Sequence, residues 1–564
     1  MQGIIFSDLD KYLAATDAVS AAPSSDKWQL LPYRCADVSG KLLFAGELSS
    51  PDDVRLRLGL SGYYKIYIAT VNLRSKNLFN LKLSSDEAFS AMSSPTMESK
   101  HAWTPTEYFE EFLWRACDLT NEDIILRKPE CMWNNACALA FIRCVPISNE
   151  EYKSYLTPSA KDHIHGHFDE DPNAEDTIAT DSDLLTRYGQ ITGGDIDEMA
   201  LEFSFDYDSH DLGIHNILRN EHEWRRADNR FFAKKETAYR MRIDYLHSHG
   251  IKAYAANRMS VASFTAPYSH WKNSFVDSHP DLYCRTRLGE TVNVCSYAYP
   301  EVRQYVIDRF ADVMKHGFDG VTLIMHRGIH VAFEEPVLNE FALRYPGVDP
   351  TRLPVTDERL NGVFSYFMTE FMKELRAALA PFCGGKAKIN VITEYTPETS
   401  KHFGIDVAEW ARLGLIDRVM QGIMEVREDL GGLTDGDGLI DKEKYSEYIK
   451  QSPVIKRYHR TDLGKAIEGS KKYLEILKGT GVAYSAALPW PHRVAYSEIE
   501  NYKARIREIG VTDFLAWNTN HTLLDVAEMH AVLGRSKEYY TVNRYRTLMF
   551  DGSNVSDYNP NWRG

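Results

Sequence analysis

From about residue 160 onward, short apolar segments alternate with long amphipathic helices, and this alternation constrains the fold more than any other feature. Residues 300–314 carry apolar side chains at helical spacing, and residues 320–325 form an apolar run of strand length. Gly317 lies between the two segments and can end the helix. A helix followed by a buried strand is one unit of an α/β fold with a parallel sheet.

The same unit recurs along the rest of the chain. Further copies cover residues 196–208, 238–258, 360–395, 406–423, 465–490 and 497–520. Seven strands are predicted near Met199, Ala253, Val321, Val391, Val419, Ala483 and Phe514, with an eighth near Ile164. Eight βα repeats predict a (β/α)8 TIM barrel. An open doubly wound sheet is the alternative, although no G-x-G-x-x-G turn follows the first strand.

The first 155 residues follow a different pattern, in which short strands are separated by turns. The predicted strands are rich in β-branched and aromatic residues and cover residues 41–48, 63–73, 78–83 and 137–147. Residues 104–119 fit either a short helix or another strand. We therefore predict an all-β sandwich over residues 1–155 and a barrel over residues 156–564.

Charge and hydropathy narrow the range of partners. The chain has 65 Lys and Arg residues against 80 Asp and Glu residues, for a net charge of −15. This balance disfavours binding to nucleic acid or to an anionic membrane surface. No segment approaches the roughly 20 apolar residues of a membrane-spanning helix. We expect a soluble protein of unknown oligomeric state, possible homo-oligomers included, which is cytoplasmic as the sequence stands or exported if a signal peptide has been removed.

The eight cysteines form no C-x-x-C pair, and we expect most of them to be reduced core residues. Cys131 and Cys137 are close enough in sequence to pair across a turn in an exported protein.

Polar and aromatic residues follow nearly every predicted barrel strand. In a TIM barrel these positions meet at the C-terminal face, where reacting groups lie. A charged group beside an apolar strand needs a partner or a ligand. The strand-end residues are Glu202, Asp206, Asn257, Arg258, His326, Arg327, Glu394, Tyr395, Gln421, Glu425, Trp490, His492, Trp517 and Asn518.

Several of these residues are carboxylates, and hydrolysis of a glycosidic bond uses a pair of carboxyl groups. Glu394 is the best single candidate, because its strand is clear and its neighbours could orient it. Its partner could be Glu425, Glu202, or a glutamate at position 334 or 335. Glu335 could equally cap the helix that begins near Pro336.

Sugar binding needs flat apolar faces and planar hydrogen-bonding groups. The candidate faces are Tyr297, Tyr395, Trp271, Trp490 and Trp517. The candidate polar groups are Asn257, Arg258, His326, Arg327, His492 and Asn518. These residues predict a carbohydrate substrate, with no cofactor and no metal.

Residues 240–520 resemble the glycoside hydrolase family 10-like group of barrel proteins. The resemblance rests on residues 249–259, 278–306, 318–328, 333–350 and 403–420. It implies a carbohydrate-active TIM barrel with a β-sandwich as an accessory domain. In that group a Glu acid/base ends strand four and a Glu nucleophile ends strand seven, whereas here strand four ends in His326-Arg327 and strand seven in Pro489-Trp490. The catalytic assignment of the family therefore does not transfer.

Two other functions fit parts of the pattern. His163, His165 and His167 form an H-x-H-x-H run on the first predicted strand, where amidohydrolase-like enzymes hold a catalytic metal. The strands at residues 389–395 and 417–423 offer no further ligand, and Asp513 lies at the wrong end of its strand. A barrel with an aromatic cleft and no working acid pair would instead bind glycans without cleaving them.

Residues 434–446 resemble a Ca²⁺ loop in acidic spacing but have Ser446 where the bidentate Glu is required, so a surface insertion is predicted there.

Overall fold

The computed structural model describes residues 3–35, 38–46, 49–71, 76–93, 108–128, 135–156, 162–168, 185, 188–192, 196–202, 235–263, 273–326, 328–422, 424–428, 432–450, 455–459, 463–488, 496–517 and 543–549. The structural statements below refer to these residues.

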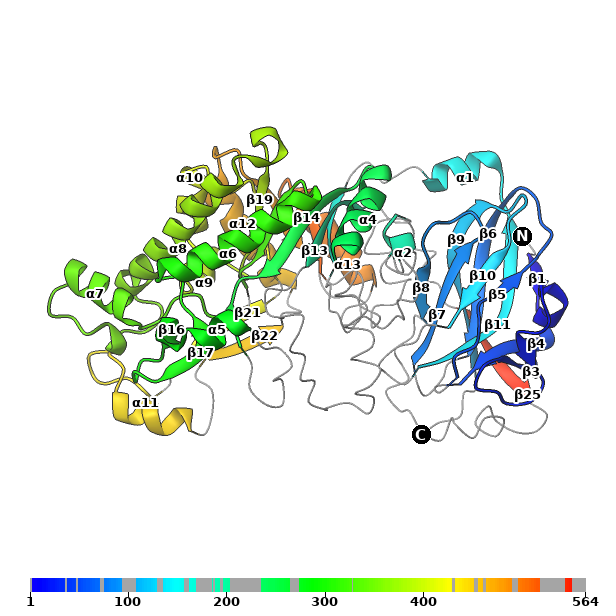
Figure 1. The fold of residues 1–564 in the computed structure, drawn as a ribbon, viewed down its shortest axis with the longest axis horizontal. Coiled ribbons are helices and arrows are strands. Elements are labelled where there is room, and N and C mark those ends of the chain that lie inside the picture. Colours follow the sequence, from blue (N-terminus) through cyan, green and yellow to red (C-terminus); the bar gives the residue numbers. More distant parts are fainter. Residues whose placement is uncertain are drawn as a thin grey trace.

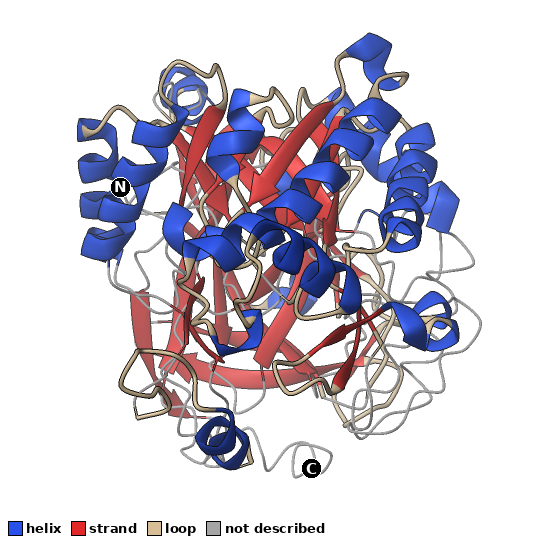
Figure 2. Ribbon diagram, turned by 90° about the vertical axis from the view of Figure 1, so that its left-hand side faces the viewer, coloured by secondary structure: helices blue, strands red, loops and turns tan. Residues whose placement is uncertain are grey.

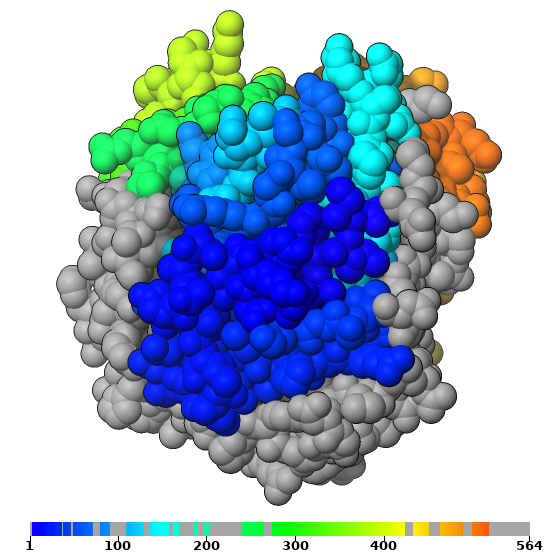
Figure 3. Space-filling model, turned by 90° about the vertical axis from the view of Figure 1, so that its right-hand side faces the viewer, coloured from blue at the N-terminus to red at the C-terminus, as the bar shows by residue number. Residues whose placement is uncertain are grey.

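The N-terminal part forms an all-β sandwich, as predicted, and is seen on the right in Figure 1. The strands of one layer are β1 (Ile4–Phe6), β2 (Val19–Ser20), β3 (Trp28–Cys35), β4 (Val38–Ala45), β6 (Tyr63–Val71), β9 (Tyr108–Asp118), β11 (Asn135–Pro146) and β25 (Asn543–Met549). Those of the other are β5 (Val54–Leu56), β7 (Lys76–Leu83), β8 (Ser90–Ser93) and β10 (Ile124–Arg127). The two layers join where the start of β11 pairs with β7. Residues from the first part of the chain cover the end of the molecule shown in Figure 3.

Alternate strand residues fill the space between the two layers. Trp28, Phe79 and Phe112 are fully buried there, because successive side chains of a strand point to opposite faces. Residues 108–118, which the sequence left open between helix and strand, form β9. Glu111 of β9 is buried, and Arg143 Nε lies 2.6 Å from its Oε1. This ion pair compensates for the charge of a glutamate inside the sheet.

The C-terminal strand β25 returns to the sandwich and pairs with both β3 and β9. The predicted barrel range of 156–564 therefore includes a strand that belongs to the N-terminal sheet. No sequence pattern indicates this return, because pairing between strands more than 400 residues apart leaves no local signal. The two ends of the chain thus build one sheet (Figure 1).

Eight parallel strands close into a barrel, which confirms the predicted TIM-barrel fold. In barrel order they are β12 (His163–Phe168), β13 (Ile196–Glu202), β14 (Lys252–Arg258), β18 (Gly320–Ile324), β19 (Lys388–Ile392), β20 (Arg418–Met420), β23 (Ala483–Ala487) and β24 (Asp513–Ala516). All eight predicted strand centres fall inside these strands. Figure 2 shows the barrel strands with helices around them.

Helices connect and cover the strands. The α-helices are α1 (Asn149–Leu156), α2 (Tyr188–Thr192), α4 (Lys235–Ser248), α5 (Ser274–Ser278), α6 (Pro300–Val313), α7 (Glu335–Arg344), α8 (Glu358–Leu379), α9 (Pro397–Lys401), α10 (Val407–Arg412), α11 (Lys442–Ile449), α12 (Leu463–Leu477) and α13 (Tyr496–Glu508). The 3₁₀ turns are η1 (Leu9–Tyr12), η4 (Pro280–Leu282), η5 (Met314–His316), η6 (Pro350–Arg352) and η7 (Phe382–Gly385). Gly317 ends α6 and η5 with a φ of 102°, as its position predicted. No helix in the described ranges is long and apolar enough to cross a membrane.

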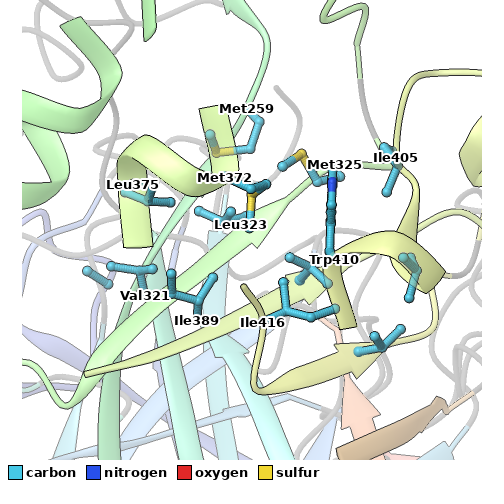
Figure 4. Packing of buried hydrophobic residues seen from close by; sticks show 14 of the residues in the cluster. Met259, Val321, Leu323, Met325, Met372, Leu375, Ile389, Ile405, Trp410 and Ile416 are labelled. Carbon is cyan, nitrogen blue, oxygen red and sulfur yellow. The ribbon is translucent and has the colours of Figure 1, made fainter. Parts of the chain in front are cut away.

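The outer faces of the strands pack against the helices (Figure 4). Leu323 of β18 and Ile389 of β19 are fully buried together with Met372 and Leu375 of α8. Burying an aliphatic side chain of this size contributes roughly 1.5 to 3 kcal/mol. Trp410 of α10 is also fully buried, and its indole N–H donates to Thr369 Oγ1 at 3.0 Å.

Aspartates at the N-terminal rim tie neighbouring parts of the barrel together. In three places an aspartate at the start of a strand accepts a hydrogen bond from the backbone N–H of the preceding barrel strand. The pairs are Asp197 with Ile164 at 3.1 Å, Asp319 with Ala253 at 2.9 Å, and Asp417 with Ile389 at 2.9 Å. Each bond satisfies a donor that the strand ladder leaves open at its end.

Two small sheets extend the connections that follow barrel strands. β15 (Val261–Ala262), β16 (Tyr283–Arg285) and β17 (Thr291–Cys295) form a sheet between β14 and β18. β21 (Met424–Glu428) and β22 (Ile455–His459) form a second sheet between β20 and β23. Both begin soon after a barrel strand ends, so they extend the C-terminal side of the barrel.

Candidate active site at the C-terminal face of the barrel

The barrel interior has three levels, which follow from the two-residue period of its strands. The middle level is apolar and contains Ala200, Ala256, Ile324, Ile392, Met420, Ala487 and Leu515. Two residues further along the strands lie the side chains of the C-terminal level. They are Glu202, Arg258, His326, Glu394 and Trp517, with Gly422 at the end of β20. His167 of β12 joins this level by its contacts with Glu202 and Trp517.

Glu202 lies between side chains from both neighbouring strands. Its Oε2 lies 3.1 Å from His167 Nε2 on β12, and its Oε1 lies 2.8 Å from Arg258 Nε on β14. The side chain of Glu202 is 11% exposed and that of Arg258 33%, whereas His167 is fully buried. The guanidinium and the imidazole therefore fix the carboxylate at the mouth of the barrel.

Trp517 forms an aromatic cluster with two histidines. Its ring stacks on His167 with centroids 3.9 Å apart and planes 2° apart. The ring of His326 meets it nearly perpendicularly at 4.8 Å. Trp517 is only 4% exposed. Within the described residues its main visible role is thus to hold the histidines, and its predicted contact with a sugar stays a prediction.

The backbone of Glu394 is anchored to two helices. Its N–H donates to Ser400 Oγ of α9 at 3.2 Å, and its carbonyl accepts from the hydroxyl of Tyr473 of α12 at 2.9 Å. The Ser400 and Tyr473 hydroxyls are 2.8 Å apart. Burial raises the pKa of Tyr473, so its hydroxyl keeps its proton and remains a donor. Glu394 is 2% exposed and follows Ile392 in the inward register.

Gly422 follows β20 at a position where a side chain would not fit. A Cβ at this position would lie 2.1 Å from the carbonyl oxygen of Thr393 and 3.3 Å from Cβ of His326. The neighbouring Gln421 points outward, and its amide donates to the carbonyls of Tyr395 and Ala466, each at 3.1 Å. The end of β20 therefore brings its backbone close to His326 and adds no side chain to the site.

Three predicted substrate contacts are instead buried in other surroundings. Tyr297 is fully buried, and its hydroxyl donates to the carbonyl of Met259 at 2.6 Å. Tyr395 belongs to the core between strands and helices. Asn257 is 1% exposed and shares the outward register of Ala255. The structure gives Tyr297 and Tyr395 packing roles and places Asn257 apart from Glu202, because alternate residues at a strand end face opposite sides.

The predicted carboxylates Glu334 and Glu335 lie at the start of α7, where each has a local role. Glu335 is exposed in the first turn of α7, where a negative charge favours the helix dipole. Its neighbour Glu334 is fully buried and accepts hydrogen bonds from Ser296 Oγ and from the N–H of Ala332. Burial raises the pKa of Glu334 above its ordinary value. The backbone of Glu425 lies in β21, opposite Tyr458 of β22.

Several predicted residues lie outside the described residues. They are Arg327, Trp490, His492 and Asn518, together with Asp206, Trp271 and Cys131. The other seven cysteines are free thiols.

The three histidines of β12 have different partners at different levels. His163 is exposed at the N-terminal rim, with Nδ1 3.2 Å from Asp197 Oδ2. His165 lies below the apolar level, and His167 lies above it. No group of three or more His, Cys, Asp or Glu side chains in the described part of the chain could hold a metal. The predicted H-x-H ligand pair is therefore not assembled there.

A buried ionic network fills the N-terminal level of the barrel. Arg418 Nη1 lies 2.7 Å from Asp513 Oδ1 and 2.6 Å from His165 Nε2. His165 Nδ1 lies 3.0 Å from Glu198 Oε2. Burial raises the pKa of Glu198, but His165, Arg418 and Lys252 outweigh it, so the pKa lies below its ordinary value. This network closes the interior at the face opposite to Glu202 and Glu394.

The acidic loop at residues 434–446 is organised by hydrogen bonds and by an arginine. Asp435 Oδ1 accepts from the N–H groups of Asp437 and Leu439, each at 3.0 Å, and Arg352 pairs with its Oδ2. Asp441 caps α11. The carboxylates thus serve a turn and a helix start, in keeping with the predicted insertion.

No protein-family model matches the chain, and no curated protein matches it either. Solved structures do match. The glycoside hydrolase domain of PelA from Pseudomonas aeruginosa is 16% identical over 64% of this chain and 94% of its own, with a TM-score of 0.31. TtGalA, an α-galactosidase from Thermus thermophilus, is 12% identical over 90% of this chain and 94% of its own, with a TM-score of 0.32. A GH26-CBM35 β-(1,4)-mannanase from Podospora anserina is 11% identical over 95% and 97%, with a TM-score of 0.29.

At TM-scores near 0.3 these matches do not place the chain in a family. The fold follows from the strand pairing of this chain. The closed barrel agrees with the fold that the resemblance to the family 10-like group implies. Membership of that group stays a prediction.

Proposed function

We propose that the chain is a glycoside hydrolase that acts on an oligo- or polysaccharide and uses Glu394 and Glu202 as its carboxyl pair. The observation that supports this is the placement of the two residues. Both lie in the inward register at the C-terminal ends of barrel strands. They are the carboxylates of that level among the described strand ends. This is the face on which TIM-barrel enzymes carry their active sites.

In the barrel order the two glutamates come from strands three positions apart. Glu202 ends β13 and Glu394 follows β19, with β14 and β18 between them on one side. A glycosidic bond held between them would meet one carboxyl group from each side. One group gives its proton to the leaving oxygen as the C–O bond breaks. The other either attacks the anomeric carbon or removes the proton from the water that does so.

The site residues around the pair suit a sugar. Arg258 is partly exposed at the mouth, and planar nitrogen groups of this kind bind pairs of hydroxyl groups. His326 is buried beside Trp517 at the same level. The sequence predicts further sugar contacts at Arg327, Trp490, His492 and Asn518, which lie outside the described residues. Glu425 remains a weaker candidate for the second carboxylate.

A panel of 4-nitrophenyl glycosides and soluble polysaccharides tests the proposal. The wild type should release nitrophenol or reducing ends from at least one member. Glu394→Gln and Glu202→Gln should each lower kcat by roughly 10²- to 10⁴-fold, which is the usual contribution of a positioned acid or base. Glu335→Gln is the matched control, and it should stay within about twofold of wild type, because this glutamate is exposed on α7.

The result against hydrolysis would be a wild type that binds a glycan of the panel but never cleaves it. That outcome would support a non-catalytic glycan-binding barrel. Full activity in Glu394→Gln would instead move catalysis to another carboxylate.

A further inference from the structure

The carboxylate of Glu202 has a separate partner on each oxygen. The two partners come from the strands on either side of β13 in the barrel. His167 contacts Oε2 and Arg258 contacts Oε1. The backbone of Glu394 is held by Ser400 and Tyr473.

The ring of His167 is fixed by its surroundings. β12 and β24 are adjacent and in register, with Gly166 opposite Ala516, so the next side chains, those of His167 and Trp517, lie face to face. Their planes differ by 2° and their centroids are 3.9 Å apart. His167 is fully buried. Stacking therefore fixes the plane of the imidazole, and within this plane Nε2 faces Oε2 of Glu202.

The charge of Arg258 bears on the role of Glu202. An arginine guanidinium has only donors and stays positively charged, and its Nε lies 2.8 Å from Oε1 of Glu202. The imidazole of His167 donates to Oε2 when its proton is on Nε2. A positive neighbour at this distance suits an ionised Glu202 better than a proton donor.

We propose that His167 is a positioning residue that orients Glu202 as the ionised carboxylate of the pair, which leaves the proton-donating role to Glu394. This inference rests on the proposed function. In this division of work Glu394 protonates the leaving oxygen, and Glu202 faces the anomeric carbon or its attacking water. His167 itself does not touch the substrate and acts through Glu202.

Two substitutions separate the hydrogen bond from the stack. His167→Phe keeps an aromatic ring against Trp517 but removes the N–H. His167→Gln loses the ring but restores an amide N–H. Steady-state kinetics are measured on the 4-nitrophenyl glycoside that the wild type cleaves fastest. A misplaced reacting group can cost about 10²-fold in rate. We therefore expect kcat of His167→Phe to fall about 10²-fold, with KM within about threefold of wild type. The kcat of His167→Gln should be at least about tenfold higher than that of His167→Phe.

A double variant checks that the effect passes through Glu202. If His167 acts by orienting this carboxylate, adding His167→Phe to Glu202→Gln should change kcat less than twofold, because residues that act as a unit are not additive. The control is His163→Gln on the same strand, an exposed side chain that pairs with Asp197. It should keep wild-type kcat. Thermal unfolding of each variant shows whether the barrel is intact.

The two possible failures give different results. If the wild type cleaves members of the panel but His167→Phe keeps its kcat, or if the two substitutions are additive, the positioning role is wrong and the glycosidase proposal stands. Equal losses in His167→Phe and His167→Gln would also overturn the role, because packing alone would then explain them. If the wild type cleaves no member, the proposed function itself fails, and the role of His167 fails with it.

Discussion

At the scale of single residues, the barrel separates two kinds of charged group. His165 and His167 are two residues apart on β12, yet they belong to opposite ends of the interior. His165 joins a network in which every acidic group has a basic partner, and such a network closes the barrel bottom. His167 joins Glu202 at the open end. The apolar level between them keeps the two sets of charges apart.

The network at the closed end should contribute stability that depends on pH. Burial raises the pKa of Asp513, but hydrogen bonds from His165 and Arg418 outweigh it and leave the pKa at about 2, below the ordinary 3.8. A group with a lowered folded-state pKa stabilises the protein above its unfolded-state pKa, and this stability is lost as the pH falls toward 2. We expect Asp513→Asn to lower the free energy of unfolding by about 2 kcal/mol at pH 7.

Urea unfolding at pH 7 and pH 3 measures this difference. The gap between wild type and Asp513→Asn should narrow at the lower pH. A gap that is equal at both values would show that the charge of Asp513 does not stabilise the fold.

At the scale of elements, the end of β20 is shaped by the absence of a side chain. Gly422→Ala would place a Cβ 2.1 Å from the carbonyl of Thr393, the residue before Glu394. Because backbone must move to relieve this contact, the substitution should cost more than about 2 kcal/mol of stability and displace Glu394, with loss of activity. Differential scanning calorimetry and kcat measure the two effects.

Gly362→Ala is the matched control for Gly422→Ala. Gly362 lies inside α8, and a Cβ there would meet nothing within 4 Å. Alanine is the better helix former by about 0.5 to 1 kcal/mol, so this variant should be slightly more stable than wild type. A Gly422→Ala variant that behaves like Gly362→Ala would contradict the close approach of β20 to Thr393.

The repeating elements were predictable because each barrel strand and helix has its own local pattern. Contacts between strands were less predictable. Glu111 could not be assigned to a strand from sequence, since a glutamate pair inside an apolar segment also fits a helix, and Arg143 neutralises Glu111 only in the folded sheet. His167 was grouped with His163 and His165 as a metal run. Its actual partners, Glu202 and Trp517, lie on other strands.

At the scale of the whole molecule, the sandwich is not a separate N-terminal unit. β25 lies between β3 and β9 in the sheet, so removal of the C-terminal segment should expose two unpaired strand edges. Exposed edges promote association. A chain ending at residue 517 should therefore aggregate or form oligomers in size-exclusion chromatography.

A chain ending at residue 549 is the control for this truncation, because it keeps β25. It should elute like the full-length protein. Identical elution of the two truncated chains would contradict the role of β25 in closing the sheet.

The central claim is that Glu394 acts as the acid opposite an ionised Glu202, and leaving-group dependence tests it most directly. The measurement is kcat/KM, which reports on departure of the leaving group, for wild type and Glu394→Gln on two glycosides of the same sugar, one with a 2,4-dinitrophenyl and one with an alkyl leaving group. An activated phenol departs without protonation, so Glu394→Gln should stay within about tenfold of wild type on the first and lose roughly 10²- to 10⁴-fold on the second. Equal losses on both substrates would contradict the account.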